Sequence, residues 1–473
     1  MFYPAAASRR RSRGRAEPFS VVRFRSIGND DGLAESKPRT TQHHLGGRAG
    51  RCVCTPAPMD YAKRLTRVSR QRQPSAIRRL MPYMSEPGMI SLGGGLPNAS
   101  LFPFTGVSVR LADTTLDLSP GQVADALQYS ATPGLPSLLG WLRRLQADRH
   151  GVAVDADDGA ARSICVTGGS QEAFSKAVEM LVEPTGAILV DDPCYSGVLA
   201  FLRPYGCQIV GVRTDHDGVD PDDLDRQLSS WAGPRPKPGV LYTNPTASNP
   251  TGATLSVARR HALYDVAEAH DLIILEDDPY YFLHPDQDAL PSLLSLDRSN
   301  RVIRFDSFSK VLSSGLRVGF ATGPSPLIER MNLHTQASNL HTSGLSQALV
   351  AALFDHWGLA GFRAHLARCA RFYTSQRDAL LAAADRHLAG LADWSAPQAG
   401  MFLWIRVRRD GIDDTRDLIE RKALSAKVLF VPGQAFSAAA DRPSAHLRAS
   451  YSTASPADMD LAMRRLADLI RDE

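Results

Sequence analysis

The chain has 473 residues, of which 43% are hydrophobic and 22% are charged, and its formal net charge is +4. A chain of this length buries a large core without disulfide bonds and is long enough for two or more domains. Its longest apolar runs, such as Leu272–Leu275 and Met401–Ile405, are far shorter than the ~20 residues of a membrane-spanning helix. The sequence therefore excludes a membrane-spanning protein, a fibre and a wholly disordered chain.

The positive charge is concentrated at the N-terminus. Residues 1–58 carry 11 basic and 4 acidic residues, whereas the rest of the chain carries 43 basic and 46 acidic ones. A nucleic-acid-binding surface is therefore not implied. A segment rich in Arg and Ser and poor in acids is typical of a mitochondrial presequence, which would place the protein in the matrix. The alternatives are a disordered extension or residues upstream of a true start at Met59, with a cytoplasmic protein.

The six cysteines indicate neither a metal site nor a disulfide framework. Cys52 and Cys54 are close neighbours, but no second pair completes a zinc site. The other four stand alone, so we expect reduced thiols and no metal.

From residue 163 onward, short apolar strands alternate with helical segments. Ser170 is predicted to cap a helix, and a second helix is predicted over Ser256–His270. This alternation predicts an α/β fold with a mainly parallel sheet covered on both faces, in which ligands bind at the carboxyl ends of the strands. The predicted strands are Ser163–Val166, Ala187–Val190, Gln208–Val212, Gly239–Thr243, Leu272–Leu275 and Arg301–Phe305.

After about residue 360 the pattern changes to a smaller α+β unit. Its predicted helices are Phe362–Leu388 and Asp414–Leu424, and its predicted strands are Gly400–Val407, Val428–Val431 and Leu447–Ser450. The expected organisation is an N-terminal extension (1–58), an arm with the start of the small domain (59–103), a large domain (104–360) and a small C-terminal domain (361–473).

Polar residues follow several of these strands. Gly168 and Gly169 precede a helix start, which suits a phosphate because free amides and a partial positive charge meet there. Asp277 ends an apolar strand, where an acid is costly unless it is paired with a cation; by itself, an N-cap or turn aspartate is the favoured interpretation. Lys310 lies just beyond a buried strand, where a desolvated amine can form a Schiff base with an aldehyde. Asn249 lies in a turn that does not itself require asparagine.

Together these residues describe a phosphate cradle, an aldehyde-binding lysine and an acid beside a protonated ring nitrogen. Pyridoxal 5′-phosphate fits that set. The chain resembles the fold-type I, class I/II aminotransferases that use this cofactor, and within them the kynurenine/α-aminoadipate aminotransferase group. The resemblance extends from Met59 to the C-terminus. Its matching stretches are Ile90–Asn98, Leu101–Pro103, Gln128–Ser130, Asp192–Gly197, Asn249–Gly252, Glu276–Phe282, Asp306–Lys310, Ser313–Gly319, Gly400–Ile405 and Leu447–Ser450.

The resemblance implies a role for each matching residue. Lys310 would carry the cofactor as an internal aldimine and later move a proton, Asp277 would pair with the pyridine nitrogen, and Tyr280 would bind the ring oxygen. The other implied cofactor contacts are Ser170, Gln171, Tyr195, Asn249, Ser307, Ser309 and Arg317. Tyr129 matches a tyrosine that reaches the phosphate of the neighbouring subunit, which implies a homodimer with shared active sites.

The resemblance also implies the substrate contacts. Arg448 would bind the α-carboxylate, Arg78 the distal end of the substrate, and Asn249 and Gly95 would line the pocket. The expected reaction is a ping-pong transfer of an amino group from an L-amino acid to 2-oxoglutarate. The donor stays open between 2-aminoadipate, kynurenine and aromatic or branched-chain amino acids.

The chain departs from the family pattern at two places beside the pocket. Gly93 stands where the family often has Ala, and Thr243–Ser248 differs before Asn249. A lyase of the same fold would share Lys310 and Asp277, so those two residues do not exclude it. A transcription regulator of the same fold is the other alternative, but residues 1–58 show no periodic apolar pattern for a DNA-binding domain.

Overall fold

The computed structural model describes residues 59–472 except 81, 82, 84, 85, 94, 155–160, 287, 288 and 410. The described residues belong to one compact unit, Pro56–Glu473. The predictions for residues 1–58, including Cys52 and Cys54, lie outside the described residues. Cys194, Cys207 and Cys369 form no disulfide bond. Among the described helices, none is long and apolar enough to cross a membrane.

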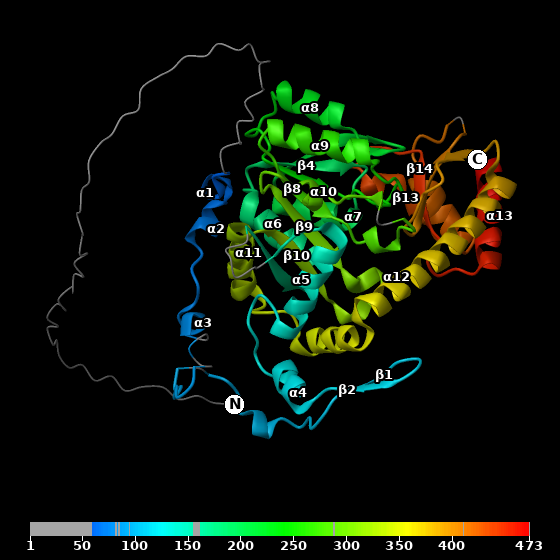
Figure 1. Cartoon of the computed structure of the whole chain (residues 1–473). Helices are drawn as coiled ribbons and strands as arrows, with labels where there is room; N and C mark the ends of the chain where they lie inside the picture. The colour runs from blue at the N-terminus through cyan, green and yellow to red at the C-terminus, as the bar shows by residue number, and fades with distance from the viewer. Residues whose placement is uncertain are drawn as a thin grey trace, which may run out of the picture. The chain divides into compact units, whose positions relative to one another are not determined.

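An eight-stranded sheet forms the centre of the unit (Figure 1). Five neighbouring strands, β9, β8, β7, β4 and β5, are parallel, whereas β10 runs antiparallel between β3 and β9, and β6 is an antiparallel edge strand. In sheet order the strands are β3 (Arg162–Thr167), β10 (Gly319–Pro324), β9 (Val302–Ser307), β8 (Ile273–Asp277), β7 (Val240–Thr243), β4 (Ala187–Asp192), β5 (Gln208–Asp215) and β6 (Gly218–Val219). Every strand predicted in this region is present, and β10 and β6 are additional.

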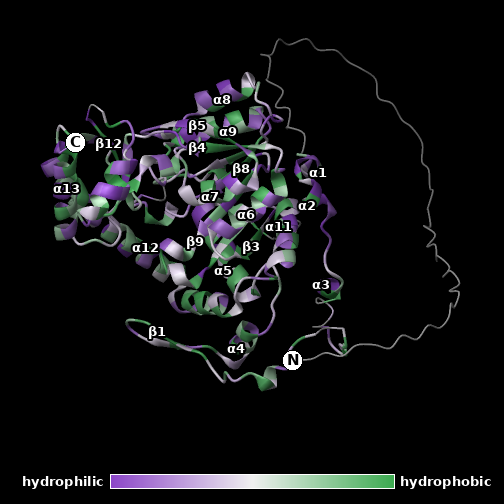
Figure 2. Ribbon diagram, turned by 180° about the vertical axis from the view of Figure 1, so that it is seen from behind, coloured by the Kyte–Doolittle hydropathy of each residue, from purple (hydrophilic) through white to green (hydrophobic). Residues whose placement is uncertain are grey.

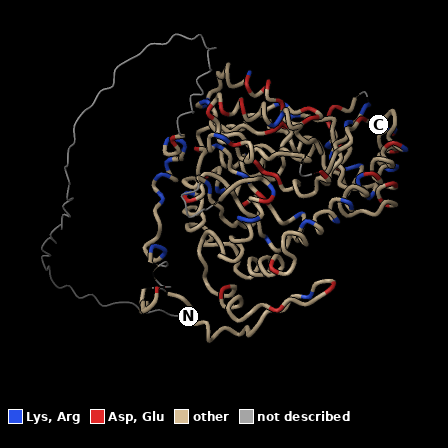
Figure 3. The backbone as a smooth tube through the Cα atoms, viewed as in Figure 1, with Lys and Arg blue, Asp and Glu red and all other residues tan. Residues whose placement is uncertain are grey.

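Helices cover both faces of this sheet, because the central strands are apolar on both sides. The first face packs against α5 (Pro136–His150), α8 (Pro221–Ser229), α9 (Val257–Ala269) and α10 (Leu293–Leu296). The second face packs against α6 (Ser170–Leu181), α7 (Ser196–Tyr205) and α11 (Ser325–Ser338). Figure 2 shows hydrophobic residues within these layers, and Figure 3 shows acidic and basic residues interspersed along the surrounding helices.

The start of α6 differs from the prediction by one residue. Gly169, not Ser170, is the N-cap, and its φ of 100° lies in the left-handed region that favours glycine. A Cβ at this position would lie 2.6 Å from Nη2 of Arg317. The close approach of Arg317 to the helix start therefore requires glycine there.

A second, four-stranded antiparallel sheet forms the C-terminal part of the unit. Its order is β11 (Ala392–Trp394), β12 (Phe402–Val407), β14 (His446–Ser450) and β13 (Val431–Pro432). The long helix α12 (Gly344–Leu388) links the two parts and contacts α13 (Pro456–Arg471) beside the small sheet (Figure 1). Gly358, with φ 60° and ψ −178°, interrupts α12.

Several expectations for this part were wrong in extent. The predicted helix Phe362–Leu388 matches the part of α12 that follows the interruption at Gly358, but the part from Gly344 to Trp357 was not predicted. The predicted strand Val428–Val431 is observed only as Val431–Pro432. The predicted helix Asp414–Leu424 contains a π-helical segment, Leu418–Ala423. β11 and α13 were not predicted.

The N-terminal described segment exposes large apolar side chains. It contains α1 (Tyr61–Arg64), α2 (Arg67–Gln71), α3 (Ala76–Leu80), β1 (Ser108–Arg110), β2 (Thr115–Asp117) and α4 (Pro120–Leu127). Ile90, Leu92 and Leu101 are 87%, 97% and 81% exposed. Monomeric soluble proteins rarely expose so many large apolar side chains along one segment.

Candidate active site

A cavity of about 340 Å³ lies at the carboxyl ends of β7, β8 and β9, where the α/β pattern predicted a ligand. Every predicted cofactor and substrate residue lines it except Tyr129, Arg78 and Gly95. The lining residues are Ser170, Gln171, Tyr195, Tyr242, Asn244, Asn249, Asp277, Pro279, Tyr280, Ser307, Ser309, Lys310, Ser314, Arg317, Phe402 and Arg448.

Asp277 is the last residue of β8 and is buried against the second face of the sheet. Its Oδ2 accepts a hydrogen bond of 2.8 Å from the Tyr242 hydroxyl. Its Oδ1 is buried and has no hydrogen-bond partner among the described residues. Burial raises the pKa of this carboxyl to about 6. A ligand with a protonated ring nitrogen would give Oδ1 the partner that it lacks.

Lys310 ends the short helical turn Phe308–Lys310 that follows β9. Burial lowers the pKa of its amine, and the positive charges of Arg448 and Arg317 lower it further. A lowered pKa increases the neutral fraction of the amine, and only a neutral amine can attack an aldehyde. The position of Lys310 in the same cavity as Asp277 therefore suits a covalent bond to a ring-bearing aldehyde.

One end of the cavity is built to hold an anion. The first-turn amides of α6 have no partner within the helix, and Ser307, Ser309 and Arg317 lie beside them. The Arg317 guanidinium donates to Ser309 Oγ at 3.2 Å and to the Gly168 carbonyl at 2.6 Å. No carboxylate forms an ion pair with Arg317 within the part of the chain that the structure describes. Its charge is available to a phosphate.

Arg448 enters the cavity from β14 of the small sheet. Its Nη1 donates to Asn249 Oδ1 at 2.8 Å, and its guanidinium lies 4.2 Å from the centre of the Phe402 ring and 5.0 Å from that of Phe436. Its Nε is buried without a partner, and none of the described carboxylates pairs with it. Burial lowers its pKa. A half-buried guanidinium without an ion pair is suited to bind a substrate carboxylate.

Two tyrosines complete the walls. Tyr280 is buried and packs edge-on to Phe402, with ring centres 5.9 Å apart. Tyr195 precedes α7 and lines the cavity. Burial raises the pKa of both hydroxyls, and the charge of Asp277 adds to the effect. Both phenols are therefore protonated donors at neutral pH.

Sequence reasoning missed five lining residues: Tyr242, Asn244, Pro279, Ser314 and Phe402. Pro279 lies between the predicted residues Asp277 and Tyr280. The positions of Tyr242 and Asn244 offered a signal, because they lie at the end of a predicted strand beside the strand of Asp277. Ser314 and Phe402 gave no such signal, since each reaches the cavity only through tertiary packing.

The three remaining predicted residues lie outside the cavity. Arg78 donates from Nη1 to the Ser130 carbonyl at 2.8 Å. Tyr129 is 50% exposed and packs edge-on to His341, and Gly95 is also exposed. The described chain does not bring them to the Lys310 site.

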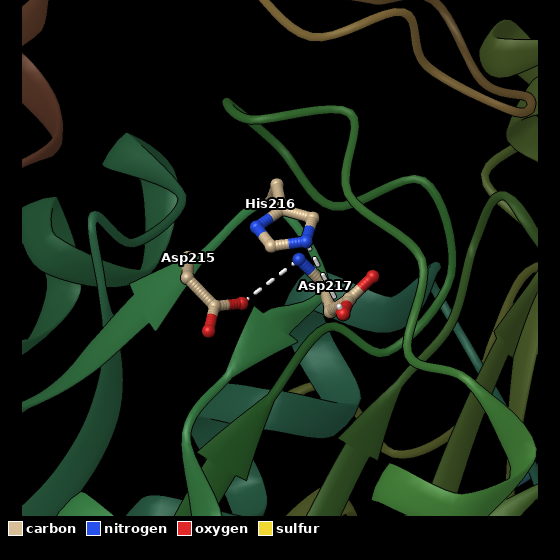
Figure 4. A group of neighbouring side chains, drawn as sticks. All are labelled: Asp215, His216 and Asp217. Atoms are coloured by element: carbon tan, nitrogen blue, oxygen red, sulfur yellow. Dashed lines mark hydrogen bonds and ion pairs between the residues drawn. The ribbon is translucent and has the colours of Figure 1, made fainter.

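A larger cavity, about 690 Å³, lies between the two sheets and contains none of the predicted residues. Asp215 and His216 line it, and together with Asp217 they have ligand atoms close enough for a metal ion (Figure 4). These residues form the turn between β5 and β6, in which the Asp217 amide donates to Asp215 Oδ1 at 2.8 Å. Both oxygens of Asp215 also accept hydrogen bonds from Arg259. The turn and this ion pair explain the arrangement, and we assign no metal to it.

Comparison with known proteins gives a consistent result. The model of the family described as "Aminotransferase class I and II" matches residues 121–466. The mitochondrial kynurenine/alpha-aminoadipate aminotransferase of Bos taurus is 44% identical over 88% of this chain and 100% of its own length. The aminotransferase Aro8 of Candida albicans superposes with a TM-score of 0.79 at 29% identity, covering 88% of this chain and 99% of that one. The alpha-aminoadipate aminotransferase LysN of Thermus thermophilus, complexed with N-(5′-phosphopyridoxyl)-L-leucine, gives a TM-score of 0.65 at 28% identity, with coverage of 88% and 99%.

Proposed function

Since the chain belongs to the class I and II aminotransferases, which use pyridoxal 5′-phosphate, we propose that it transfers the amino group of L-2-aminoadipate or L-kynurenine to 2-oxoglutarate. The observation that carries the proposal is the meeting of Lys310, Asp277 and an unpaired Arg448 in one cavity. The 44% identity to kynurenine/alpha-aminoadipate aminotransferases supports the choice of donor.

The residues present fit the cofactor. The α6 amides with Ser307, Ser309 and Arg317 would hold its phosphate. The free Oδ1 of Asp277 would hold a proton at the pyridine nitrogen, and the Tyr242 bond would orient that carboxylate. Tyr195 would stack on the ring, while Tyr280 and Asn249 would bind its oxygen. When bound, the cofactor supplies an electron sink for the charge that develops at the substrate Cα.

The chain's own groups then perform the transfer. The Lys310 amine would bind the cofactor aldehyde, be displaced by the substrate amine, and take the proton from the substrate Cα with its Nζ. Arg448 would hold the α-carboxylate with two donors, and so fix the Cα–H bond in relation to Lys310. Because donor and acceptor share an α-carboxylate, one pocket serves both half-reactions.

Reduction with borohydride tests the covalent link. The purified protein should be yellow, and reduction should fix a pyridoxyl group on Lys310. Lys310→Ala should lose both the label and transamination. Lys176→Ala is the matched control, because Lys176 is buried against α11, where its Nζ donates to Ser338 Oγ at 2.7 Å. A label on any other lysine contradicts the assignment.

A donor panel tests the substrate. Aminoadipate, kynurenine, tyrosine and leucine should be compared against 2-oxoglutarate by kcat/KM, and aminoadipate or kynurenine should rank first. A higher rank for tyrosine or leucine would transfer the proposal to an aromatic or branched-chain donor. Elimination or decarboxylation of the donor without transfer of nitrogen would favour a lyase.

The proposed active unit is a homodimer with shared sites. Exposed apolar side chains on the N-terminal described segment and the position of Tyr129 outside the cavity of its own chain support it. Within each subunit, residues 104–360 would form the large domain and 361–473 the small one, with the interruption of α12 at Gly358 near their boundary. Mixed dimers of Lys310→Ala and Tyr129→Ala should regain activity, because one site would be intact. No recovery would place Tyr129 in its own subunit's site.

Residues 1–58 are proposed as a mitochondrial presequence. Their excess of Arg over acids supports this, and the mammalian relatives carry the word mitochondrial in their names. Fused to a reporter protein, these residues should direct it to the matrix. A cytosolic reporter would leave the other interpretations of the segment.

A further inference from the structure

The sequence departs from the family pattern in the segment Thr243–Ser248. Within this segment, Asn244 connects Asp277 with the loop of Asn249. Asn244 is 6% exposed. Its Oδ1 accepts a hydrogen bond of 2.9 Å from the backbone N–H of Asn249. Its Nδ2 donates to the backbone carbonyl of Asp277 at 2.5 Å. One side chain therefore contacts both the loop that meets Arg448 and the strand end that carries Asp277.

The bond to Asp277 fills a gap in the ladder between β7 and β8. The Ile273 amide donates to the Gly239 carbonyl at 2.9 Å. The two-residue repeat of a parallel ladder then pairs the Asp277 carbonyl with the N–H of residue 245. Residue 245 is proline, which has no N–H. The Asn244 side chain supplies the missing donor, which keeps a buried carbonyl bonded.

The opposite end of this connection reaches the small sheet. Asn249 Oδ1 accepts the 2.8 Å bond from Arg448 Nη1. The Asn244 backbone is itself fixed, because its amide donates to Asp191 Oδ2 at 2.9 Å, and the same oxygen accepts from Thr243 Oγ1 at 3.1 Å. The chain of contacts runs from Asp191 through Asn244 and Asn249 to Arg448.

We propose that Asn244 is a positioning residue that sets the orientation of Arg448 toward the substrate α-carboxylate, acting through Asn249. The inference rests on the proposed function, because it takes Arg448 as the carboxylate-binding group. The α-carboxylate is common to every donor and acceptor, so the effect of Asn244 must be the same for all of them. It should appear mainly in KM, because Arg448 itself remains, and an α-carboxylate that is bound to it still has its Cα–H bond fixed in relation to Lys310.

The test is Asn244→Ala in the cofactor-saturated holoenzyme. KM should rise about tenfold for both donor and 2-oxoglutarate, as expected for the loss of one ordering hydrogen bond, while kcat changes less than threefold. Tyr242→Phe is the matched control. It removes the hydrogen bond to the Asp277 carboxylate, whereas Asn244 contacts only the Asp277 backbone carbonyl, and it removes no contact to Asn249. It should therefore lower kcat and leave KM unchanged.

A double-mutant cycle identifies the route. In an Arg448→Ala background, Asn244→Ala should raise KM no further, because the group through which it acts is gone. An unchanged KM in the single variant, or the same rise in both backgrounds, would overturn the inference. If Asn244→Ala does not fold, Asn244→Ser replaces it, because the shorter hydroxyl cannot reach both the Asn249 backbone N–H and the Asp277 carbonyl. Its KM should rise for donor and 2-oxoglutarate alike, and an unchanged KM would overturn the inference.

Failure of the proposed function is distinguishable from failure of this inference. A wild-type protein without transaminase activity, or an Arg448→Ala variant with unchanged KM, would overturn the proposed function and this inference with it. If both behave as expected and Asn244→Ala changes nothing, only the role of Asn244 is wrong.

Discussion

Three consecutive acids, Glu276, Asp277 and Asp278, lie at the end of β8. Their side chains alternate between the two faces of the sheet and have different partners on each face. On the first face, Glu276 accepts hydrogen bonds from the Leu293 and Leu294 amides, and Arg304 lies 3.0 Å from Glu276 and 3.1 Å from Asp278. On the second face, Asp277 has one phenol on Oδ2 and no partner on Oδ1 among the described residues.

Two arginines, the fully buried Arg304 and the half-buried Arg448, show the same contrast. Arg304 is fully buried and pairs with three carboxylates: Glu276, Asp278 and Asp306. Arg448 faces the cavity and pairs with none of the described carboxylates. A buried charge without a partner is costly. The fold therefore gives the acids of the first face a cation, and it leaves Asp277 and Arg448 without an ion pair among the described residues, where a ligand can supply one.

Asp277→Ala gives the largest expected effect. It removes the group that would keep the ring nitrogen protonated, so kcat should fall by roughly 10³-fold or more, with the fold intact. The measurement is kcat at saturating cofactor, with a thermal melt as the check on folding. Asp278→Asn is the control, because it changes the neighbouring acid on the other face and should cost stability. A nearly unchanged rate in Asp277→Ala would assign this role to another residue.

Arg304→Met tests the ion pairs on the first face of the sheet. It leaves three buried carboxylates without their cation, which should lower the free energy of unfolding by about 3–5 kcal/mol. Urea unfolding of the cofactor-free protein measures the loss. Arg298→Met is the control, because Arg298 pairs with Asp265 and Glu268 at the surface, and such pairs contribute about 0–1 kcal/mol. Equal losses in the two variants would show that the buried cluster is not special.

The sequence predicted the strand ends well, because buried parallel strands are continuous apolar runs that stop at polar turns. β10 escaped prediction because Gly319 and the pair Gly323-Pro324 are residues that usually mark turns. α13 had a readable signal that was overlooked: Ser455 caps it, Pro456 begins it, and its buried residues recur at helical spacing.

Strand periodicity alone could not decide which of the three acids at the end of β8 faces the cavity. The alternation of side chains separates Asp277 from its two neighbours, but the helices that cover each face decide which side is open. Asn244 was missed for a related reason. Its hydrogen bond to the Asp277 carbonyl depends on the pairing of β7 with β8 and on the missing N–H of Pro245. No local sequence pattern predicts both.

Arg448→Ala removes the cavity guanidinium that has no ion pair among the described residues. The loss of a charge-assisted, two-donor contact should cost about 1.5–3 kcal/mol, or roughly ten- to more than a hundredfold in kcat/KM, in both half-reactions. Single-turnover kinetics with donor and with 2-oxoglutarate measure each half. Arg442→Ala is the control, because Arg442 lies outside this cavity and pairs with Asp192. A defect in only one half-reaction would contradict a shared carboxylate site.

Asp191 is an exception to the rule that charges outside the cavity are paired, because it is buried outside the cavity and no described cation pairs with it. Burial raises its pKa to about 7. The folded state therefore binds this proton more tightly than the unfolded chain, and the stabilisation is lost as pH rises from about 4 through 7.

Asp191→Asn removes this proton-binding site while keeping the acceptor for Asn244. Compared with the variant, the wild type should lose roughly 1–1.5 kcal/mol of stability between pH 5.5 and 7. Urea unfolding at several pH values measures the difference. Parallel pH profiles for the two proteins would mean that the folded protein does not raise the pKa of Asp191.

Arg78 is the remaining test and has the smallest expected effect. It lies outside the cavity and donates to the Ser130 carbonyl, beside the Tyr129 that we propose to serve the partner's site. If the dimer brings Arg78 to the distal end of the substrate, it meets a carboxylate in 2-oxoglutarate or aminoadipate and an uncharged side chain in leucine. A partly exposed pair of this kind contributes about 0.2–1 kcal/mol. Arg78→Ala should therefore lower kcat/KM for dicarboxylates about two- to fivefold and leave leucine unchanged. Arg79→Ala, one residue further along α3, is the matched control and should spare both. Equal losses for dicarboxylates and leucine would mean that Arg78 only orders its own segment, and the contrast between paired and unpaired charges would then hold within the cavity alone.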